Sequence, residues 1–208
     1  VTAFLYAGIP GRHYWLTAIM AARFLASAFA SGPALLILLC VVVRKFTKFD
    51  PGKEQIRTLG GIVAYAMIFN VFFMLLEVFT AFYSQIPGHM HSIVYLFAGH
   101  EGHGNMVPLM WTATFFAAVS MMLLIVPWTR RKESFLILAC VSVIIATWID
   151  KGFGLVVGGF VPNPLDRYVE YSPTIPELGV SVCNWAIGAF IITILFKITS
   201  SVKEEAAA

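Results

Sequence analysis

The stretch that decides the fold is Phe72-Phe73-Met74-Leu75-Leu76-Glu77-Val78-Phe79-Thr80-Ala81-Phe82-Tyr83, in which one carboxylate, that of Glu77, lies among apolar residues. It belongs to a segment of about residues 59–83, which is long enough to cross a bilayer. An ionisable group at that depth costs a few kcal/mol, so it needs a partner, a wet cavity or a neutral form. Glu77 is therefore a candidate for moving protons, ions or a redox carrier.

The composition is that of a membrane protein. Of the 208 residues, 59% are hydrophobic and only 12% are charged, whereas about 25% of the residues of a soluble domain are charged. Apolar segments that reach or approach the length of a membrane span lie at about residues 15–43, 59–83, 106–128, 134–151 and 176–198. The sequence predicts an all-α fold, a polytopic transmembrane helical bundle with five spans in a single domain of residues 1–208.

Basic residues are concentrated at one end of these spans. The loops after the first and third spans are rich in them, with Arg44, Lys45, Lys48, Lys53, Arg57, Arg130, Arg131 and Lys132. The opposite side carries only Arg12, Lys151 and Arg167. The positive-inside rule therefore predicts an exoplasmic N-terminus and a cytoplasmic C-terminus. Residues 84–105 and 152–175 then form two exoplasmic loops.

Polar residues inside the predicted spans are the candidates for proton transfer. Asn70, Glu77 and Thr80 lie roughly on one helical face, and Tyr83 continues it outwards. Such a face suits a proton path or a carbonyl-binding pocket, and the alternative is a hydrogen bond that only holds helices together. Arg23, inside the first span, either snorkels to the interface or pairs with one of the buried carboxylates.

Asp150 and Lys151 end the fourth predicted span. A carboxylate at a helix C-terminus is disfavoured by the helix dipole, whereas a lysine there is favoured. We therefore expect Asp150 to have a specific partner, with Arg23 as the first choice, and the alternative is a charge pair that faces water. The apolar, glycine-rich residues 152–160 form either a helix extension or an interfacial segment.

Histidines lie outside the predicted spans, and their spacing is only a weak indication of a metal-binding site. His89, His91, His100 and His103 share one predicted loop, and His89 and His91 are candidates for proton exchange at the membrane surface. The three cysteines fall in three different spans without a Cys-x-x-Cys pair, and no histidine lies inside a span. We therefore expect no metal site, iron–sulfur cluster or bis-histidine haem in this chain.

Proline-rich residues 160–177 favour an extended, ordered path. Arg167, Glu170 and Tyr171 from this loop, with His100 and His103, are the candidates for contact with a partner protein. The alternative is a solvated connector that only caps the bundle.

Five segments carry a resemblance to a known family: RFLASAFASG at residues 23–32, EVFTAFY at 77–83, HEGHGNMVP at 100–108, DKGFGL at 150–155 and EYSPT at 170–174. In order and spacing they resemble the NrfD/PsrC family, the quinone-interacting membrane subunits of respiratory complexes. The resemblance covers nearly the whole chain and corresponds to the C-terminal half of a member of the ten-helix branch. It is closest to DsrP of DsrMKJOP-type complexes, with HybB-like and Hmc-type subunits as alternatives.

The resemblance implies electron exchange between the menaquinone pool and an exoplasmic, ferredoxin-like iron–sulfur subunit, in a complex with further membrane and redox subunits. The family's quinone pocket lies largely in its N-terminal helices, so menaquinone is expected to be bound by the complex while this half supplies a proton path. Glu77 would be the proton-loading carboxylate, with Arg23 and Asp150 as its electrostatic partners. The chain would then be one subunit of an oxidoreductase complex in anaerobic, sulfur-linked respiration.

Two other classes of function remain open. A secondary transporter or ion channel would use the same charges for coupling, although the chain shows no inverted repeat. A structural membrane anchor for the iron–sulfur subunit would need Glu77 only to hold helices together. The predicted partners are proteins and the lipid bilayer, and not nucleic acid.

Overall fold

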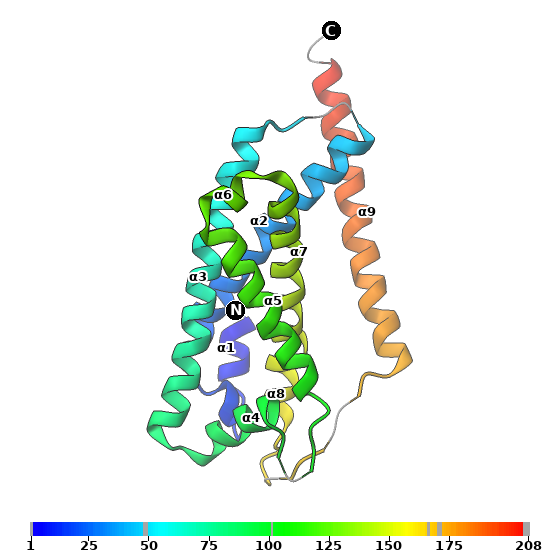
Figure 1. Ribbon diagram of the computed structural model, residues 1–208. Helices are drawn as coiled ribbons and strands as arrows, with labels where there is room; N and C mark the ends of the chain where they lie inside the picture. Colours follow the sequence, from blue (N-terminus) through cyan, green and yellow to red (C-terminus); the bar gives the residue numbers. More distant parts are fainter. Residues whose placement is uncertain (1, 48–49, 101, 166, 170–171, 206–208) are drawn as a thin grey trace. The chain divides into compact units, whose positions relative to one another are not determined.

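The computed structural model describes residues 2–47, 50–100, 102–165, 167–169 and 172–205 (Figure 1). The protein is 81% helical, and the described residues form no strand. Among them, five helices are long and apolar enough to span a membrane, namely Met20–Phe46, Lys53–Ser84, Val107–Ile125, Glu133–Phe160 and Ile175–Ser201. The all-α fold with five spans is confirmed, while the orientation of the termini stays a prediction.

The chain divides into two compact units, residues 1–170 and 171–208, and each is described by itself. The second unit holds one long helix, α9 (Ile175–Glu205). At its start, Oε2 of Glu177 accepts hydrogen bonds from the backbone N–H and the hydroxyl of Thr174, at 2.7 and 2.9 Å. The carboxylate thus satisfies a donor at the positive end of the helix dipole. The prediction of a single domain stays a prediction.

Four long helices form the first unit: α2 (Met20–Phe46), α3 (Lys53–Ser84), α5 (Val107–Ile125) and α7 (Glu133–Ile149). Helix α2 packs against α3 and α7, and α5 packs against α7 and α3 (Figure 1). Small residues such as Ala30, Ala34 and Ala139 are fully buried where these helices meet. Small side chains at such contacts let helix backbones approach closely, which is how helices pack in a bilayer.

Short helices lie at both ends of this bundle (Figure 1). Helix α6 (Pro127–Arg131) lies at one end. Helix α4 (Pro87–Phe97), helix α8 (Val156–Phe160) and the 3-10 turn η1 (His13–Trp15) lie at the other, and α1 (Thr2–Ala7) packs against α2. Residues 84–105 were expected to be a loop, but they contain α4, which begins at a proline in its first turn.

The fourth membrane-spanning helix does not end at Lys151. It continues through a π-helical stretch, η2 (Asp150–Leu155), into α8 and ends at Phe160. Residues 152–160 are therefore a helix extension rather than an interfacial segment. The placement of Asp150 at a helix C-terminus was wrong, since the backbone remains helical beyond it. Single π-helical turns inside α-helices are frequent at functional sites, and this one contains Asp150.

Trp15 fixes η1 beneath the bundle. It is fully buried, and its Nε1–H donates a hydrogen bond to the carbonyl of Leu155 at 2.8 Å. Its ring packs against Tyr6 and edge-on against Phe160. The predicted first span included Trp15, but helix α2 begins only at Met20.

Candidate functional site

Arg23, Glu77 and Asp150 meet in the interior of the first unit, each from a different membrane-spanning helix. Nη1 of Arg23 donates to Oε2 of Glu77, and Nη2 donates to Oδ1 of Asp150 at 2.6 Å. The three residues are only 3%, 7% and 8% exposed. One guanidinium therefore serves two carboxylates and joins α2, α3 and η2.

Lys151 and Tyr14 complete this group, which we call the charge cluster. Nζ of Lys151 lies 3.1 Å from Oδ2 of Asp150, the oxygen that Arg23 does not use, and lies over the ring of Phe24. When all four charged groups are ionised, two positive and two negative charges cancel. This balance matters because an unpaired charge in a low-dielectric interior costs several kcal/mol.

Tyr14 brings a phenol from η1 to the cluster. It is 5% exposed, and its side chain lines the same small cavity as Arg23. Burial raises the pKa of this phenol above its usual range, although the positive charge of Arg23 acts in the opposite direction. Tyr14 thus stays protonated at neutral pH and keeps its O–H as a hydrogen-bond donor.

A small cavity adjoins the cluster. Tyr14, Arg23, Glu77 and Asp150 contribute its polar wall, and the apolar wall consists of Met74, Val78, Ile93, Phe97 and Met110. Its volume of about 10 Å³ is enough for about one water molecule. This space is too small for a menaquinone ring.

The other predicted residues of α3 separate into two groups. Asn70 is buried two turns from Glu77, and its Oδ1 has no hydrogen-bond partner among the described residues. Thr80 is exposed and its hydroxyl donates to the carbonyl of Leu76, while Tyr83 is 80% exposed and stacks on Phe79.

The geometry of an α-helix explains this separation. Each residue turns the helix by about 100°, so Asn70 lies within about 20° of Glu77 around the axis. Thr80 is about 60° and Tyr83 about 120° away from Glu77. The shared face predicted from the spacing therefore does not extend to Thr80 and Tyr83, and the structure does not bring them to the charge cluster.

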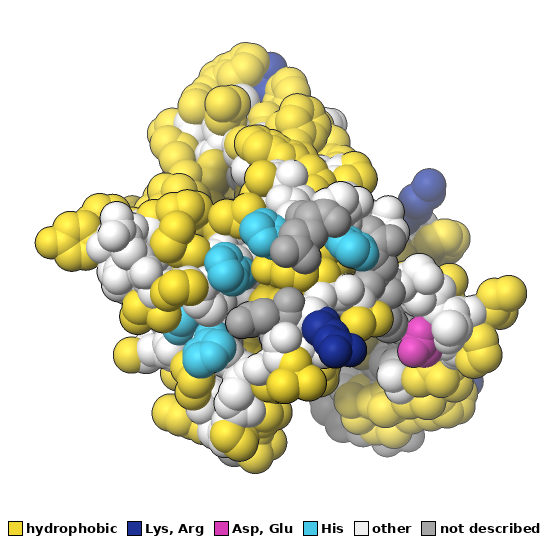
Figure 2. All heavy atoms as spheres, turned by 90° about the horizontal axis from the view of Figure 1, so that it is seen from below, with side chains coloured by type: hydrophobic (Ala, Val, Ile, Leu, Met, Phe, Trp, Pro, Cys, Tyr) yellow, Lys and Arg dark blue, Asp and Glu magenta, His cyan; other side chains and the backbone are white. Residues whose placement is uncertain are grey.

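Histidine side chains gather at the end of the first unit that carries α4 and η1 (Figure 2). The rings of His91 and His100 stack with their centroids 5.4 Å apart, and the ring of Tyr168 lies 4.8 Å from that of His100. His103 exchanges two backbone hydrogen bonds with His100. In the part of the chain that the structure describes, no three His, Cys, Asp or Glu side chains are placed to hold a metal ion.

His89 has a distinct environment within this group. It is half-buried, and burial together with the neighbouring His13 lowers the pKa of its imidazole. His89 is therefore neutral at pH 7 and gains a proton only under more acidic conditions than a free histidine.

The predicted partner-contact residues are only partly described. Arg167 is exposed, and its backbone N–H donates to Oδ1 of Asn163 at 3.0 Å in a turn. His100 and His103 are half-buried beside Tyr168. Glu170 and Tyr171 lie outside the described residues, so contact with a partner stays a prediction.

Sequence reasoning missed Tyr14. A tyrosine just before a membrane span is an ordinary interfacial residue, and nothing in the sequence marks it as part of a site. Tyr14 lines one cavity with Arg23 because Trp15, whose indole N–H is bonded to the carbonyl of Leu155, holds η1 at this end of the bundle.

Comparison with known proteins places this geometry in a family. The family model described as "Polysulphide reductase, NrfD" matches residues 1–161, which include the whole charge cluster. A putative dimethyl sulfoxide reductase membrane subunit of Halobacterium salinarum is 25% identical, over 92% of this chain and 48% of that protein. The menaquinone reductase integral membrane subunit of Nitratidesulfovibrio vulgaris is 23% identical, over 88% of this chain and 44% of that protein.

The chain thus spans about half the length of these curated relatives. Because the family model matches well over half of its residues, the chain belongs to the NrfD, or polysulphide reductase, family.

Proposed function

We propose that this chain is part of an integral membrane subunit that exchanges electrons between the menaquinone pool and an exoplasmic iron–sulfur subunit. Family membership and five helices able to span a membrane support a membrane redox role. One relative is named as a membrane subunit of a menaquinone reductase. The proposal includes a DsrP-like complex and the cytoplasmic membrane of a prokaryote, both from the sequence resemblance.

In this proposal, this part of the subunit transfers protons. The main observation behind that role is that Arg23 is shared between two buried carboxylates. When Glu77 takes up a proton, Arg23 keeps its pair with Asp150, and the cluster changes from neutral to a single positive charge. When Glu77 releases the proton, the ion pair forms again. The water-sized cavity beside Glu77 supports this role, because a water molecule there could exchange a proton with the carboxylate.

The cavity beside the charge cluster, at about 10 Å³, is smaller than the ring of menaquinone. In this proposal menaquinone is bound elsewhere in the complex. Reduction of a quinone takes up two protons with two electrons, so such a complex needs a proton supply. Arg23, Glu77 and Asp150 would belong to that supply, with Lys151 and Tyr14 holding Asp150 and Arg23 in place.

The test is Glu77→Gln in the assembled complex, with Glu54→Gln as the matched control because Glu54 is an exposed carboxylate of the same helix. Quinol-linked electron transfer and proton uptake are measured on the same preparation, after the amount of assembled complex has been checked. We expect Glu77→Gln to slow proton-coupled turnover by at least about a hundredfold, the low end of what a positioned proton-transfer group typically contributes. The control should keep its activity.

The two alternative functions predict different results. A structural anchor would keep its turnover and proton uptake after Glu77→Gln, and that outcome would refute the proton role. A transporter or ion channel would move ions in proteoliposomes without quinol. Purification of the chain together with an iron–sulfur subunit would argue against transport.

A further inference from the structure

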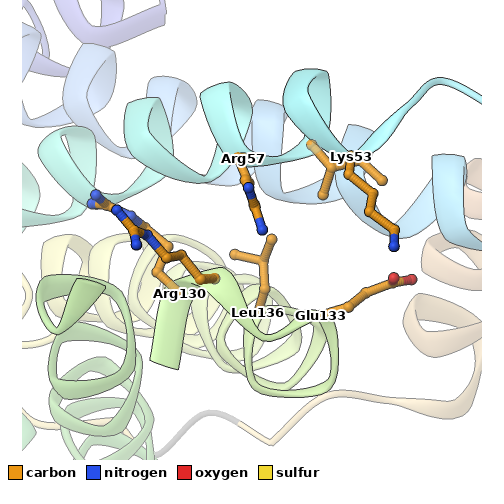
Figure 3. A pocket seen from close by; sticks show the side chains of 7 residues that line it. Lys53, Arg57, Arg130, Glu133 and Leu136 are labelled. Atoms are coloured by element: carbon orange, nitrogen blue, oxygen red, sulfur yellow. The ribbon is translucent and has the colours of Figure 1, made fainter. Parts of the chain in front are cut away.

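A pocket with a basic lining lies at the other end of the first unit from the histidines, between α3, α6 and α7 (Figure 3). We call it the basic pocket. Its volume is about 200 Å³, and its lining residues are Lys53, Ile56, Arg57, Arg130, Arg131, Glu133 and Leu136. A further hollow of about 390 Å³ is lined by Arg57, Arg130 and Arg131.

The lining has an excess of positive charge. Its one carboxylate, Glu133, accepts a hydrogen bond from Nη2 of Arg44, which lies outside the pocket. Among the described residues, no ion pair joins a carboxylate to the four cations of the lining, Lys53, Arg57, Arg130 and Arg131. Cations gathered in one hollow repel each other, so an anion bound between them would be stabilised.

The pocket has an apolar floor below this charged rim. Leu136 and Ile56 are 2% and 5% exposed. Gly60 lets α3 lie close to this floor, since a Cβ at that position would be only 3.1 Å from Cδ1 of Leu136. Figure 3 shows Lys53 and Arg57 extending from α3 towards the side that carries Leu136 and Glu133.

Its position matches the level of lipid headgroups. Helix α3 begins at Lys53, α5 ends at Ile125 and α7 begins at Glu133, so the pocket lies where the spans end. Trp128 is exposed there with Nζ of Lys132 3.8 Å from its ring centroid, and exposed tryptophans are typical of the boundary between membrane and water. The exposed apolar side chains of Ile125 and Val126 precede α6.

We propose that the basic pocket binds the phosphate of an anionic phospholipid headgroup, with Arg57 and Arg130 as its main ligands. Two guanidinium groups match phosphate oxygens in geometry and charge, and the first turn of α3 adds the positive end of a helix dipole. Basic pockets between membrane helices are suited to acidic headgroups. The acyl chains of the lipid would lie along Ile125 and Val126, an apolar contact that a free phosphate ion lacks.

The experiment uses the protein purified from membranes in detergent with its associated subunits and then stripped of lipid. Phosphatidylglycerol, cardiolipin, phosphatidylcholine or sodium phosphate is added, and thermal unfolding and native mass spectrometry report binding. We expect phosphatidylglycerol or cardiolipin to bind and to raise the unfolding temperature, whereas phosphatidylcholine does neither. Arg57→Gln combined with Arg130→Gln should weaken this binding at least about tenfold, as expected when charge-assisted hydrogen bonds are lost.

Lys45→Gln is the control, because Lys45 is a cation at the same end of the bundle, in the last turn of α2, and does not line the pocket. Unchanged lipid binding in the double variant, or an equal loss in Lys45→Gln, would overturn the assignment. An equal response to sodium phosphate would assign the pocket to a free anion instead of a lipid. If the double variant does not fold, equal binding of phosphatidylcholine and phosphatidylglycerol by the unaltered protein still refutes the proposal.

Discussion

The shared arginine makes a quantitative prediction about stability. The side chains of Arg23, Glu77 and Asp150 are 4%, 8% and 12% exposed, so water screens their charges weakly. Two unit charges about 4 Å apart attract each other by about 4 kcal/mol at an effective dielectric constant of about 20. Arg23→Gln removes both attractions and leaves Glu77 without a cation, and we expect it to destabilise the protein by about 3–5 kcal/mol.

Glu77→Gln is expected to cost less. Arg23 keeps its 2.6 Å hydrogen bond to Asp150, so only one charged pair is lost, at about 1.5–3 kcal/mol. In the double variant both positions are neutral, and Asp150 still has Lys151. The double variant should therefore be no less stable than Arg23→Gln alone, which gives a coupling energy of about 2 kcal/mol between Arg23 and Glu77.

The assay is equilibrium unfolding in mixed lipid–detergent micelles, with all variants under the same conditions. Arg44→Gln is the control, because it breaks the Arg44–Glu133 pair, whose side chains are 30% and 37% exposed, and should cost at most about 1 kcal/mol. The reasoning fails if Arg23→Gln and Glu77→Gln add to within about 0.5 kcal/mol, since additive effects mean that the two side chains do not interact.

Two further predictions concern the end of the bundle that carries η1. The pKa of His89 is lowered in the folded protein, so the unfolded chain binds the proton more readily, and the free energy of unfolding should fall as the pH drops from about 7 through the ordinary histidine pKa of about 6.5. Thermal unfolding measured across this pH range should show a shallower pH dependence in His89→Gln than in the unaltered protein. An unchanged slope would contradict the lowered pKa of His89. Gly159→Ala would place a Cβ 1.9 Å from the buried ring of Trp15, so we expect a loss of about 3 kcal/mol or more in the same assay. Gly61→Ala, with no atom near the added Cβ, should not destabilise the protein, and equal effects of the two substitutions would refute this packing.

The number and type of the spans could be predicted because length and hydropathy alone determine whether a helix can cross a bilayer. Their boundaries could not. The fourth span was predicted to stop at Asp150 and Lys151 because charges normally mark the end of a span. In the structure these two residues pair with each other and with Arg23, and once paired they allow the helix to continue to Phe160.

Only the charged residues of the candidate site could be predicted from the sequence. Each buried charge carries a free-energy cost that is visible in the sequence, and this cost singled out Arg23, Glu77 and Asp150 as mutual partners. A tyrosine or threonine carries no such signal, because it is tolerated both in a core and at a membrane surface. Tyr14 was therefore missed, and Thr80 was included although its side chain is exposed and lies about 60° from Glu77 around α3.

The free-energy cost of burying a charge also bears on the function of the charge cluster. Well-packed apolar residues of similar volume are often as stabilising as a buried ion pair, so stability alone does not explain four charges at the meeting point of three helices. A fully ionised, neutral cluster differs from a structural contact in one respect: it can change its charge by one when a single carboxylate takes a proton, while Arg23 remains paired with Asp150. This property and a cavity for about one water molecule beside Glu77 are the support for the proposed proton transfer, and proton uptake by Glu77→Gln is the measurement that decides between it and a purely structural role.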